Sequence, residues 1–468
     1  HFARLRLLDA NRYPKLEDFI EEHSHYNEVA KVADLVFQKK ALTKKAKTVL
    51  KDLLIEVDSS AFEELLEDRD KLLEALVDRH GTGRVIFRNT RKALKGFPKR
   101  KVISHVLEAS EHLSEAEHDT RLREEFHKEC LVQESEESPS QDYKYSFKHD
   151  RRIQWLAEFL KGLKGEKMLL ICRSKEKVEA LQSSLLEVLK VDSAVFHEDL
   201  SLIQRDRNAA YFADNEGAQI LLCSEIGSEG RNFQFAHHLV LFDLPLNPEL
   251  LEQRIGRLDR IGQTNTIQIH VPYFKESWTE ILFKWHHESL NGMENSLKGG
   301  HLYYEANKER LLAFGEQLMK GTAFSKKEFG DFLIESAKYS KAMEQSLGEG
   351  QDRLVAINSN RPNKAKELVD LIGVTDKDSI LESLMHQLFD FFGVTVERLD
   401  AQKYFIKPEH LYTESFPNLP EEGMTLSFNR KAALSREDLA FLTWDHPMVR
   451  GAIDLMVGGD FGNAGIVR

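Results

Sequence analysis

The chain contains few cysteines, no long apolar run and no excess of basic charge. Its three cysteines, Cys130, Cys172 and Cys223, show neither a metal-binding spacing nor an even disulfide set. Cys172 and Cys223 end apolar runs, so we expect buried thiols in a reducing cytoplasm. No stretch of about eighteen apolar residues and no signal peptide is present, so we expect no membrane partner. The sequence also predicts no metal-ligand set.

The charge balance restricts how the chain could bind nucleic acid. Lys and Arg number 65 against 77 Asp and Glu, which gives a net charge of −12. Any nucleic-acid surface must therefore be a local patch. A hydrophobic fraction of 41% with 30% charged residues indicates a globular protein. The length of 468 residues predicts more than one domain.

The first part of the chain changes character near residue 79. Leucines recur at helical spacing up to about residue 78. Residues 79–101, RHGTGRVIFRNTRKALKGFPKRK, carry nine basic residues and no acidic one. We expect this segment to bind phosphate; the alternative is a solvated basic loop that docks on acidic parts of this protein. Residues 131–142, LVQESEESPSQD, predict a linker or an exposed insertion.

A regular alternation of strands and helices begins near residue 151. The apolar runs predict buried strands at 168–172, 194–196, 220–223, 239–242 and 267–271. Amphipathic helices are predicted between them at 175–190, 202–213 and 249–260. Such alternation indicates an α/β fold, with a parallel sheet covered by helices on both faces. Ligands of such sheets bind at the carboxyl ends of the strands.

The predicted helix 249–260 carries the most informative motif, Gln-x-x-Gly-Arg-x-x-Arg. Its residues are Gln253, Gly256, Arg257 and Arg260. On a helix, the amide and both guanidiniums would share one side. The opposite side would carry apolar residues, and the N-terminal turn would be formed by Asn247 as the cap and Pro248. Two aligned guanidiniums suit a transferring phosphoryl group; the plain alternative is a solvated, salt-bridged helix face.

Polar residues follow the ends of the other predicted strands. Arg173 and Ser174 follow the first strand, His197 the second and Ser224 the third. As a row they favour contacts to phosphates, although each alone could be a helix cap or a satisfied loop residue.

A glycine-containing loop follows Ser224. Gly227 and Gly230 allow the backbone to approach a phosphate or ribose, and Glu229 is the best carboxylate for a ribose hydroxyl. Without its position after a buried strand, this Gly-x-x-Gly would indicate a plain turn.

The remainder of the chain predicts further domains. After about residue 278 the pattern is helical, with a polar break at 359–364, and from 403 short apolar runs alternate with Gly, Pro and Asn. We therefore predict four regions: 1–148, with a helical and basic part; 149–290, an α/β lobe; 291–400, a helical region; and 401–468, a mixed α/β or β-rich domain.

Residues 167–271 resemble the second motor lobe of superfamily-two helicases of the Swi/Snf branch. MLLICRSKEKVEAL is similar to the fourth helicase motif, SEIGSEGRNFQ to the fifth and QRIGRLDRIGQ to the sixth. AVFHEDLSLIQRDRNAAYF resembles the motif between the fourth and the fifth. With FRNTR and GFPKR upstream and the helical-then-β tail, the chain is most similar to the bacterial RNA polymerase-associated group of this branch.

The resemblance implies that residues 1–148 contain the end of a first motor lobe with a family-specific insertion, and that residues 149–290 form the second, RecA-like lobe. It also implies a role for each site residue. Arg257 and Arg260 would be arginine fingers for ATP, while Gln253 and Gly256 would help to bind the nucleotide. The row Arg173, Ser174, His197 and Ser224 would grip one nucleic-acid strand. Arg88 and Arg91, in the place of an inter-lobe element, would contact nucleic acid, or instead the nucleotide or the other lobe.

One departure from the family pattern is large. The chain has neither a phosphate-loop motif nor the acidic Mg²⁺ motif of a first lobe. It starts with His1 and stops at Arg468 within a strand-like stretch, so we interpret it as a piece of a longer protein. We expect ATP and Mg²⁺ as cofactors, with the Mg²⁺ ligands in the first lobe, and no hydrolysis by this piece alone.

Three functions are compatible with these features. The first is a nucleic-acid-stimulated ATPase that translocates on double-stranded DNA or an RNA–DNA complex and remodels or recycles RNA polymerase. The resemblance implies this function and a cytoplasmic, nucleoid-associated location. The second is a non-catalytic docking module that binds RNA polymerase or another partner. The third is a nucleotide-binding regulator that nucleic acid does not stimulate.

Overall fold

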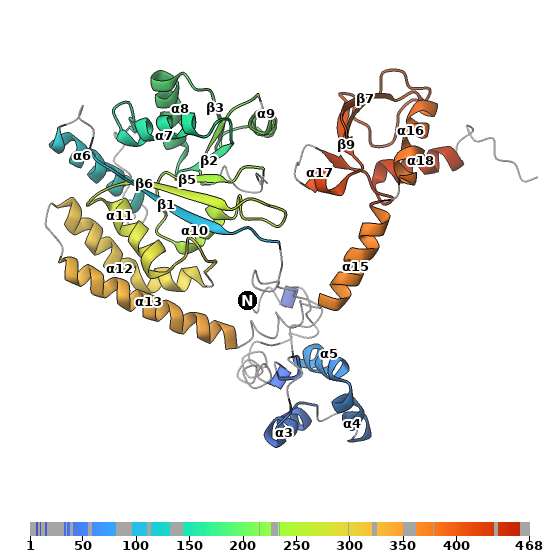
Figure 1. Ribbon diagram of the computed structural model, residues 1–468, viewed down its shortest axis with the longest axis horizontal. Helices are drawn as coiled ribbons and strands as arrows, with labels where there is room; N and C mark the ends of the chain where they lie inside the picture. The colour runs from blue at the N-terminus through green and yellow to red at the C-terminus, as the bar shows by residue number, and fades with distance from the viewer. Residues whose placement is uncertain are drawn as a thin grey trace, which may run out of the picture.

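We analysed a computed structural model of the chain. It describes residues 41–54, 59–80, 96–109, 114–131, 144–214, 216–225, 233, 235–297, 299–320, 325–349, 362–377, 379–434 and 439–458, with single residues before 38. Figure 1 shows a six-stranded sheet with its helices, a smaller four-stranded sheet near the C-terminus, and helices α3 to α5 near the N-terminus.

The large sheet is entirely parallel. Its strands are β1 (Arg100–Leu107), β2 (Met168–Ile171), β3 (Ser193–Phe196), β4 (Ile220–Cys223), β5 (His238–Leu241) and β6 (Ile267–Phe274). They lie in the order β1-β6-β5-β2-β4-β3. The structure therefore confirms the predicted α/β fold, and each of the five predicted strands is present.

Helices cover both faces of this sheet, which explains why β2 and β4 are entirely apolar. Alternate strand residues enter two cores: Met168 and Leu170 face α7 (Arg151–Gly162) and α8 (Lys175–Leu189). Leu169 and Ile171 enter the second core. That core includes residues of α9 (Leu202–Ala213), α10 (Pro248–Ile255), α11 (Trp278–Phe283), η2 (Lys284–Ser289), α12 (Gly300–Met319) and α13 (Lys326–Glu349). A strand buried on both sides needs a continuous hydrophobic run.

Strand β1 was not predicted, and it corrects the interpretation of part of the basic segment. It pairs with β6 over Arg100↔Ile267 to Leu107↔Phe274 and lies at one edge of the sheet. Arg100 is buried and forms ion pairs with Glu252 and Asp259. For Arg100, the structure therefore supports the alternative to phosphate binding, because this basic side chain docks on acidic groups of the same protein. Arg79 and His80 end α5, whereas Arg88, Arg91 and the rest of 81–95 lie outside the described residues.

The C-terminal part has its own core and a mixed sheet, as predicted. Its elements are α15 (Pro362–Thr375), α16 (Ile380–Phe392), β7 (Thr395–Asp400), β8 (Lys403–Lys407), β9 (Met424–Ser427), α17 (Arg430–Leu434), β10 (Ala440–Phe441) and α18 (Pro447–Gly458). β7, β8 and β9 pair antiparallel, and β10 adds in parallel. Phe389, Ile406, Leu426 and Met448 form part of its core.

Two further regions complete the described chain. Near the N-terminus, α3 (Lys44–Leu53), α4 (Ser59–Glu67) and α5 (Arg69–His80) share a small core that includes Leu50, Phe62 and Leu72. α6 (Glu115–Phe126) and η1 (His127–Leu131) reach the large sheet through Phe126.

Both sheets begin earlier in the chain than the predicted domain boundaries at 149 and 401, because β1 and β7 precede those boundaries. The four-domain division stays a prediction. No helix in the described part of the chain has the length and apolar character to span a membrane.

A buried histidine makes the stability of the large sheet pH-dependent. His286 in η2 is fully buried, and its Nε2 donates to the Pro245 carbonyl at 2.7 Å. Burial lowers the pKa of His286 to about 4. In the unfolded chain a histidine has a pKa of about 6.5. At a pH between about 6.5 and about 4, His286 is therefore protonated only in the unfolded chain, so the free energy of unfolding falls as the pH falls.

We expect His286→Gln to weaken this pH dependence. Acidification through that window should cost the native chain at most about 1.4 kcal/mol per pH unit at this residue. The glutamine keeps an N–H donor but cannot take up a proton. Urea unfolding at pH 7.5 and pH 5 measures the effect: the fall in unfolding free energy should be smaller in the variant. An equal fall in both proteins would show that His286 is not the group that titrates.

Candidate functional site

The helix that carries the Gln-x-x-Gly-Arg motif begins as predicted. The Asn247 side chain accepts a hydrogen bond from the Glu249 N–H at 2.9 Å, and Pro248 occupies the first turn. Leu251 and Ile255 are fully buried against the sheet. An N-cap followed by proline fixes the start of a helix because it satisfies or removes N–H groups that lack helical partners.

The helix ends sooner than predicted, and this corrects the proposed alignment of the arginines. α10 stops at Ile255, with Gly256 as its C-cap, so Arg257 and Arg260 lie in the following turn. There the Arg257 N–H donates to the Arg254 carbonyl at 3.3 Å, and the Arg260 N–H to the Leu258 carbonyl at 3.0 Å. The guanidiniums therefore do not form a line with Gln253, which is exposed on α10.

Glycine at position 256 serves the helix end itself. A Cβ there would come within 3.1 Å of the Glu252 carbonyl oxygen and 3.3 Å of the Gln253 carbonyl oxygen. Both atoms belong to the preceding helical turn, so the restriction is local. The proposed role of Gly256 beside a nucleotide stays a prediction.

Long-range contacts hold this turn in place. The Arg100 guanidinium donates to both carboxylate oxygens of Glu252, at 2.9 and 2.7 Å, and to Asp259 Oδ2 at 2.6 Å. Gln263 Nε2 donates to the Ala236 carbonyl at 2.8 Å. The buried Asp259 is thus tied to β1 through Arg100.

Arg257 and Arg260 keep part of their surface exposed to solvent. Burial raises the pKa of the Cys223 thiol, and the charge of Arg257 opposes that rise, so Arg257 lies near the carboxyl end of β4. Arg260 Nε donates to the Gly256 carbonyl at 3.4 Å. Arg254, three residues before Arg257, binds Glu225 and Asp243 after the ends of β4 and β5, so this turn lies at the edge of the sheet where ligands of α/β proteins bind.

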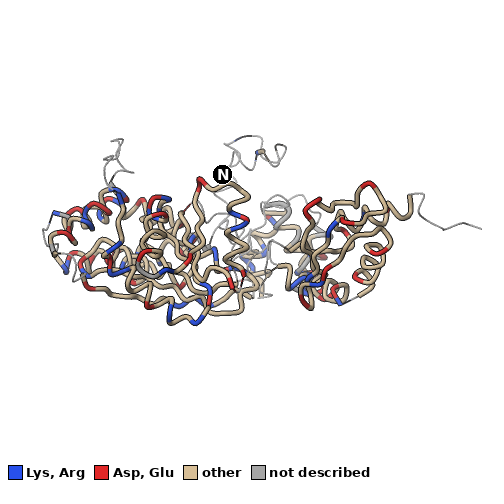
Figure 2. Tube along the Cα trace, turned by 90° about the horizontal axis from the view of Figure 1, so that it is seen from above, with Lys and Arg blue, Asp and Glu red and all other residues tan. Residues whose placement is uncertain are grey.

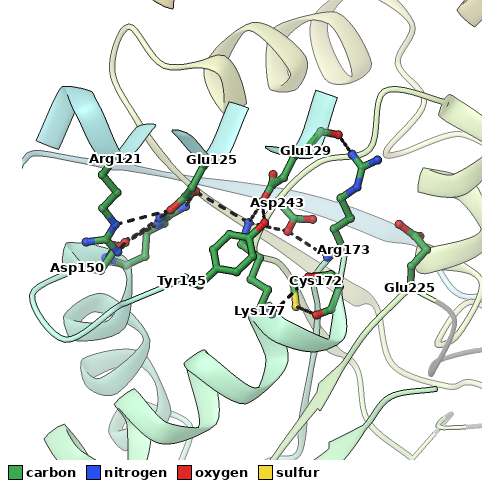
Figure 3. Close-up of polar contacts among 12 residues, drawn as sticks. Arg121, Glu125, Glu129, Tyr145, Asp150, Cys172, Arg173, Lys177, Glu225 and Asp243 are labelled. Atoms are coloured by element: carbon green, nitrogen blue, oxygen red, sulfur yellow. Dashed lines mark hydrogen bonds and ion pairs between the residues drawn. The ribbon is translucent and has the colours of Figure 1, made fainter. Parts of the chain in front are cut away.

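Lys177 forms the centre of a buried ion network at the same edge (Figure 3). Its side chain is fully buried, and its Nζ lies 2.5 Å from Glu129 Oε1 and 2.8 Å from Asp243 Oδ2. The Tyr145 hydroxyl donates to Glu129 at 3.1 Å. Burial would raise the pKa of Asp243, but Lys177 and Arg254 outweigh it and hold that pKa below its usual value. Both partners of the Lys177–Asp243 pair therefore stay charged.

Arg254 extends the network to α10. Its guanidinium donates to the Asp243 carbonyl at 2.7 Å, to Asp243 Oδ1 at 2.9 Å, and to both carboxylate oxygens of Glu225 at 2.9 and 2.6 Å. Arg254 is 1% exposed. Through this bidentate pairing, Arg254 holds α10 against the ends of β4 and β5.

The network continues away from α10 toward α6 and α7. Arg152 donates to Glu125 Oε1 at 2.8 Å and to Asp150 Oδ2 at 2.7 Å, and Arg121 also pairs with Asp150. Burial would raise the pKa of Glu125, but Arg152 and Lys177 hold it below its usual value. Alternating charges therefore connect α6, η1, α7, α8, β5 and α10 in one buried chain.

The strand-end residues meet at one edge, but two of them have ordinary structural contacts. Ser174 Oγ accepts from the Lys177 N–H at 3.3 Å and caps α8, and Ser224 Oγ donates to Glu198 at 2.7 Å. The Arg173 N–H donates to Asp243 Oδ2 at 3.1 Å, and its guanidinium to the Glu129 carbonyl. Ser174 is thus a helix cap and Ser224 is a loop residue with a hydrogen-bond partner, as the alternative to phosphate binding predicted for each. Their proposed contacts to nucleic acid stay predictions.

His197 differs from the other members of the row. It is 8% exposed, and within the described part of the chain its Nδ1 has no hydrogen-bond partner. A buried ring nitrogen without a partner is unusual and indicates that another group completes the contact. Gly227, Glu229 and Gly230 lie outside the described residues.

Sequence reasoning missed Lys177 and Arg254, the two buried bases that pair with Asp243. Lys177 lies beside Val178 on the sheet-facing side of α8, and Arg254 lies beside Ile255 on α10. A charged residue inside an apolar helical stripe was the available signal, because burying a charge requires a partner.

Comparisons with known proteins match the whole chain. Residues 151–262 match the helicase conserved C-terminal domain, and residues 266–468 match the RNA polymerase recycling family C-terminal region. The chain is 42% identical over 477 residues to the RNA polymerase-associated protein RapA of Pseudomonas putida, and 40% identical over 491 residues to that of Vibrio vulnificus. Each match covers 100% of this chain and 49% of the relative. The chain thus spans about half the length of these relatives.

A solved structure is also similar in part. The Sulfolobus solfataricus SWI2/SNF2 ATPase core in complex with dsDNA matches with 18% identity and a TM-score of 0.32, over 56% of this chain and 57% of that one. At this level of similarity the match adds nothing to the interpretation of the site.

Proposed function

Because the chain belongs to the RNA polymerase-associated RapA family of Swi/Snf-type helicase-like proteins, we propose that it supplies the second half of an ATP-driven nucleic-acid motor. The first half would lie in the part of the relatives that this chain does not span. That half would hold ATP and the Mg²⁺ ligands. Arg257 and Arg260 would reach the γ-phosphate when the two halves close.

The position of Arg257 is the observation that carries this proposal. It lies in a turn that Arg100 and Gln263 hold to the rest of the lobe, shortly after Arg254, which binds Glu225 and Asp243 at the carboxyl ends of β4 and β5. A guanidinium is a planar, permanently charged fork that can bridge two phosphate oxygens. A guanidinium that is already held in position can stabilise the negative charge that develops on a phosphoryl group without a costly rearrangement of the site.

The arginines around this turn divide into two pairs. Arg100 and Arg254 are buried and paired with carboxylates, so their role is to hold the turn in place. Arg257 and Arg260 remain partly accessible. This division supports a catalytic role for the second pair. ATP hydrolysis by the full-length protein, with and without DNA and with both guanidiniums removed, tests it.

We propose the carboxyl edge of β2, β3 and β4 as the track for a nucleic-acid strand. Arg173 and the orphaned Nδ1 of His197 lie at this edge, and Ser174 begins the 15-residue helix α8. A helix N-terminus attracts phosphates. Acidic and basic residues are interspersed along the trace (Figure 2), so the track would be a local feature.

Arg173→Ala should weaken binding of the full-length protein to duplex DNA and lower the salt dependence. One lost phosphate contact should reduce the slope of log K against log salt by about 1. Fluorescence anisotropy over a salt series measures this slope. Lys161→Ala removes the same charge from the exposed end of α7, near the opposite edge, and should leave the slope unchanged. Equal slopes for Arg173→Ala and the native protein would remove Arg173 from the track.

The name of the relatives supports RNA polymerase as the client of the full-length protein. The motor would remodel or recycle polymerase complexes by moving along their double-stranded DNA or RNA–DNA. Co-purification of polymerase with the full-length protein, and release of stalled polymerase only with ATP, would be the expected results.

A docking role is the second candidate. In the C-terminal part, an open cavity of about 700 Å³ is lined by several aromatic side chains, among them Tyr404, Phe428, Phe441 and Trp444. Aromatic residues are common where one protein binds another. If docking were the whole function, partner binding would persist and no DNA-stimulated ATP hydrolysis would occur in the full-length protein.

A further inference from the structure

Three metal-ligating side chains converge at the amino edge of the large sheet, away from the proposed motor site. They are Glu166, His237 and His238, and their ligand atoms all lie within 4.8 Å of one another. Both histidines direct Nε2 at the same oxygen, Glu166 Oε2, at 3.1 Å for His237 and 2.8 Å for His238. No role at the proposed ATP or nucleic-acid sites uses these residues.

The fold brings these residues together from distant parts of the sequence. Glu166 lies in the turn between α7 and β2, where Lys164 and Gly165 both have positive φ, 46° and 91°. His238 is the first residue of β5, and it lies opposite Met168 of β2. Since β2 and β5 are neighbours in the sheet, the turn before one strand lies beside the start of the other.

A second layer of histidines fixes the orientation of His238. Its Nδ1 lies 3.1 Å from His270 Nε2, and His270 Nδ1 lies 3.0 Å from His105 Nε2. His270 is buried, and its ring centroid lies 4.4 Å from that of Phe159 on α7. His238, His270 and His105 belong to β5, β6 and β1, so this row of histidines runs across three neighbouring strands. Histidines that bind metal ions are usually held in this way, by a hydrogen bond from the second ring nitrogen.

We propose that Glu166, His237 and His238 bind a divalent transition-metal ion, with Zn²⁺ as the best match. Two imidazole nitrogens and one carboxylate oxygen are a known three-ligand set for zinc. In a tetrahedral site with bonds of about 2.0–2.1 Å, ligand atoms lie about 3.3 Å apart. The two N···O distances are already close to this value, so small side-chain shifts would admit the ion. Ca²⁺ and Mg²⁺ prefer oxygen ligands and would fit poorly.

The exposure of the ligands leaves room for a fourth one. The Glu166 side chain is 53% exposed and that of His237 is 19% exposed, whereas His238 is 5% exposed. A water molecule can therefore complete the coordination on the solvent side. The ion would join the α7–β2 turn to β5 at the edge opposite Arg173 and Asp243. Its role is to stabilise the lobe, and it takes no part in the proposed hydrolysis.

Isothermal titration of the metal-free full chain with Zn²⁺ tests this site. We expect one ion per chain with a Kd in the micromolar range or tighter, and a higher Tm with Zn²⁺ than without it. His237→Ala and Glu166→Gln should each weaken binding more than tenfold and abolish the Tm increase. With Co²⁺ in place of Zn²⁺, the absorption bands of a tetrahedral ion should appear in the native chain only.

A matched control comes from the helix α12. His301→Ala removes an exposed histidine whose Nδ1 lies 3.8 Å from Glu305 Oε1, and among the described residues this pair belongs to no group of three possible ligands. This variant should bind Zn²⁺ like the native chain. The proposal is overturned if the native chain binds no stoichiometric Zn²⁺, or if His237→Ala and Glu166→Gln bind as tightly as His301→Ala. Circular dichroism that matches the native spectrum shows that a loss of binding does not reflect unfolding.

Discussion

Replacement of both Arg257 and Arg260 with alanine in the full-length protein is expected to lower DNA-stimulated ATP turnover about 10³–10⁵-fold. The two guanidiniums would otherwise stabilise the charge that develops on the transferring phosphoryl group. Both side chains are partly exposed in a turn after α10, so their removal should leave the lobe folded. Steady-state hydrolysis with saturating duplex DNA measures the loss.

Two comparisons separate this effect from a change in net charge. Arg310→Ala with Arg398→Ala removes the same charge from exposed positions on α12 and β7, and turnover should be unchanged. Arg257→Lys with Arg260→Lys keeps the charge, but an ammonium lacks the planar fork, so most of the activity should still be lost. If the double alanine variant retains turnover within about tenfold of the native protein, neither arginine acts as a finger.

Replacement of Lys177 with methionine should destabilise the large-sheet part by about 3–5 kcal/mol. Methionine has a similar volume, but the change leaves Glu129 and Asp243 buried without the ammonium that lies 2.5 and 2.8 Å from them. The penalty comes from uncompensated buried charge, since an intact buried pair need not itself add stability. Urea unfolding of the native and variant chains measures the difference in free energy.

A neighbouring lysine provides the control for this prediction. Lys175 lies two residues earlier on α8, at the surface near Asp199 and Glu179, and Lys175→Met should not shift the unfolding midpoint measurably. Adding Glu129→Gln to Lys177→Met should restore part of the loss, because it removes one of the two carboxyl groups that faced the ammonium, while Asp243 keeps its pair with Arg254. If Lys177→Met unfolds at the same urea concentration as Lys175→Met, the network does not hold the lobe together.

The sequence predicted the parts of the fold that depend on neighbouring residues. Five of the six strands were evident from their apolar runs, most clearly β2 and β4, in which every residue is buried and apolar because helices cover both faces. The start of α10 was evident because Asn247 and Pro248 are local signals. β1 was missed because Lys101, Ser104 and His105 interrupt its apolar residues and the strand begins within a basic segment.

The site was harder to predict because it depends on contacts between distant residues. The turn after Ile255 is held by Arg100, which lies 159 residues from Asp259 in the sequence. Lys177 meets Glu129 and Asp243 only after three separate elements pack together. The metal-ligating group escaped notice because Glu166 and His238 are separated by 72 residues, and only the β2–β5 pairing makes them neighbours.

The most direct test of the proposed motor is a structure of the full-length protein with Mg²⁺, ADP and aluminium fluoride. The fluoride group occupies the place of the transferring γ-phosphoryl. We predict that a guanidinium nitrogen of Arg257, and one of Arg260, will lie about 2.7–3.2 Å from the fluoride. If the closed nucleotide site instead leaves both guanidiniums directed away from the fluoride, the proposed catalytic role of this chain is contradicted.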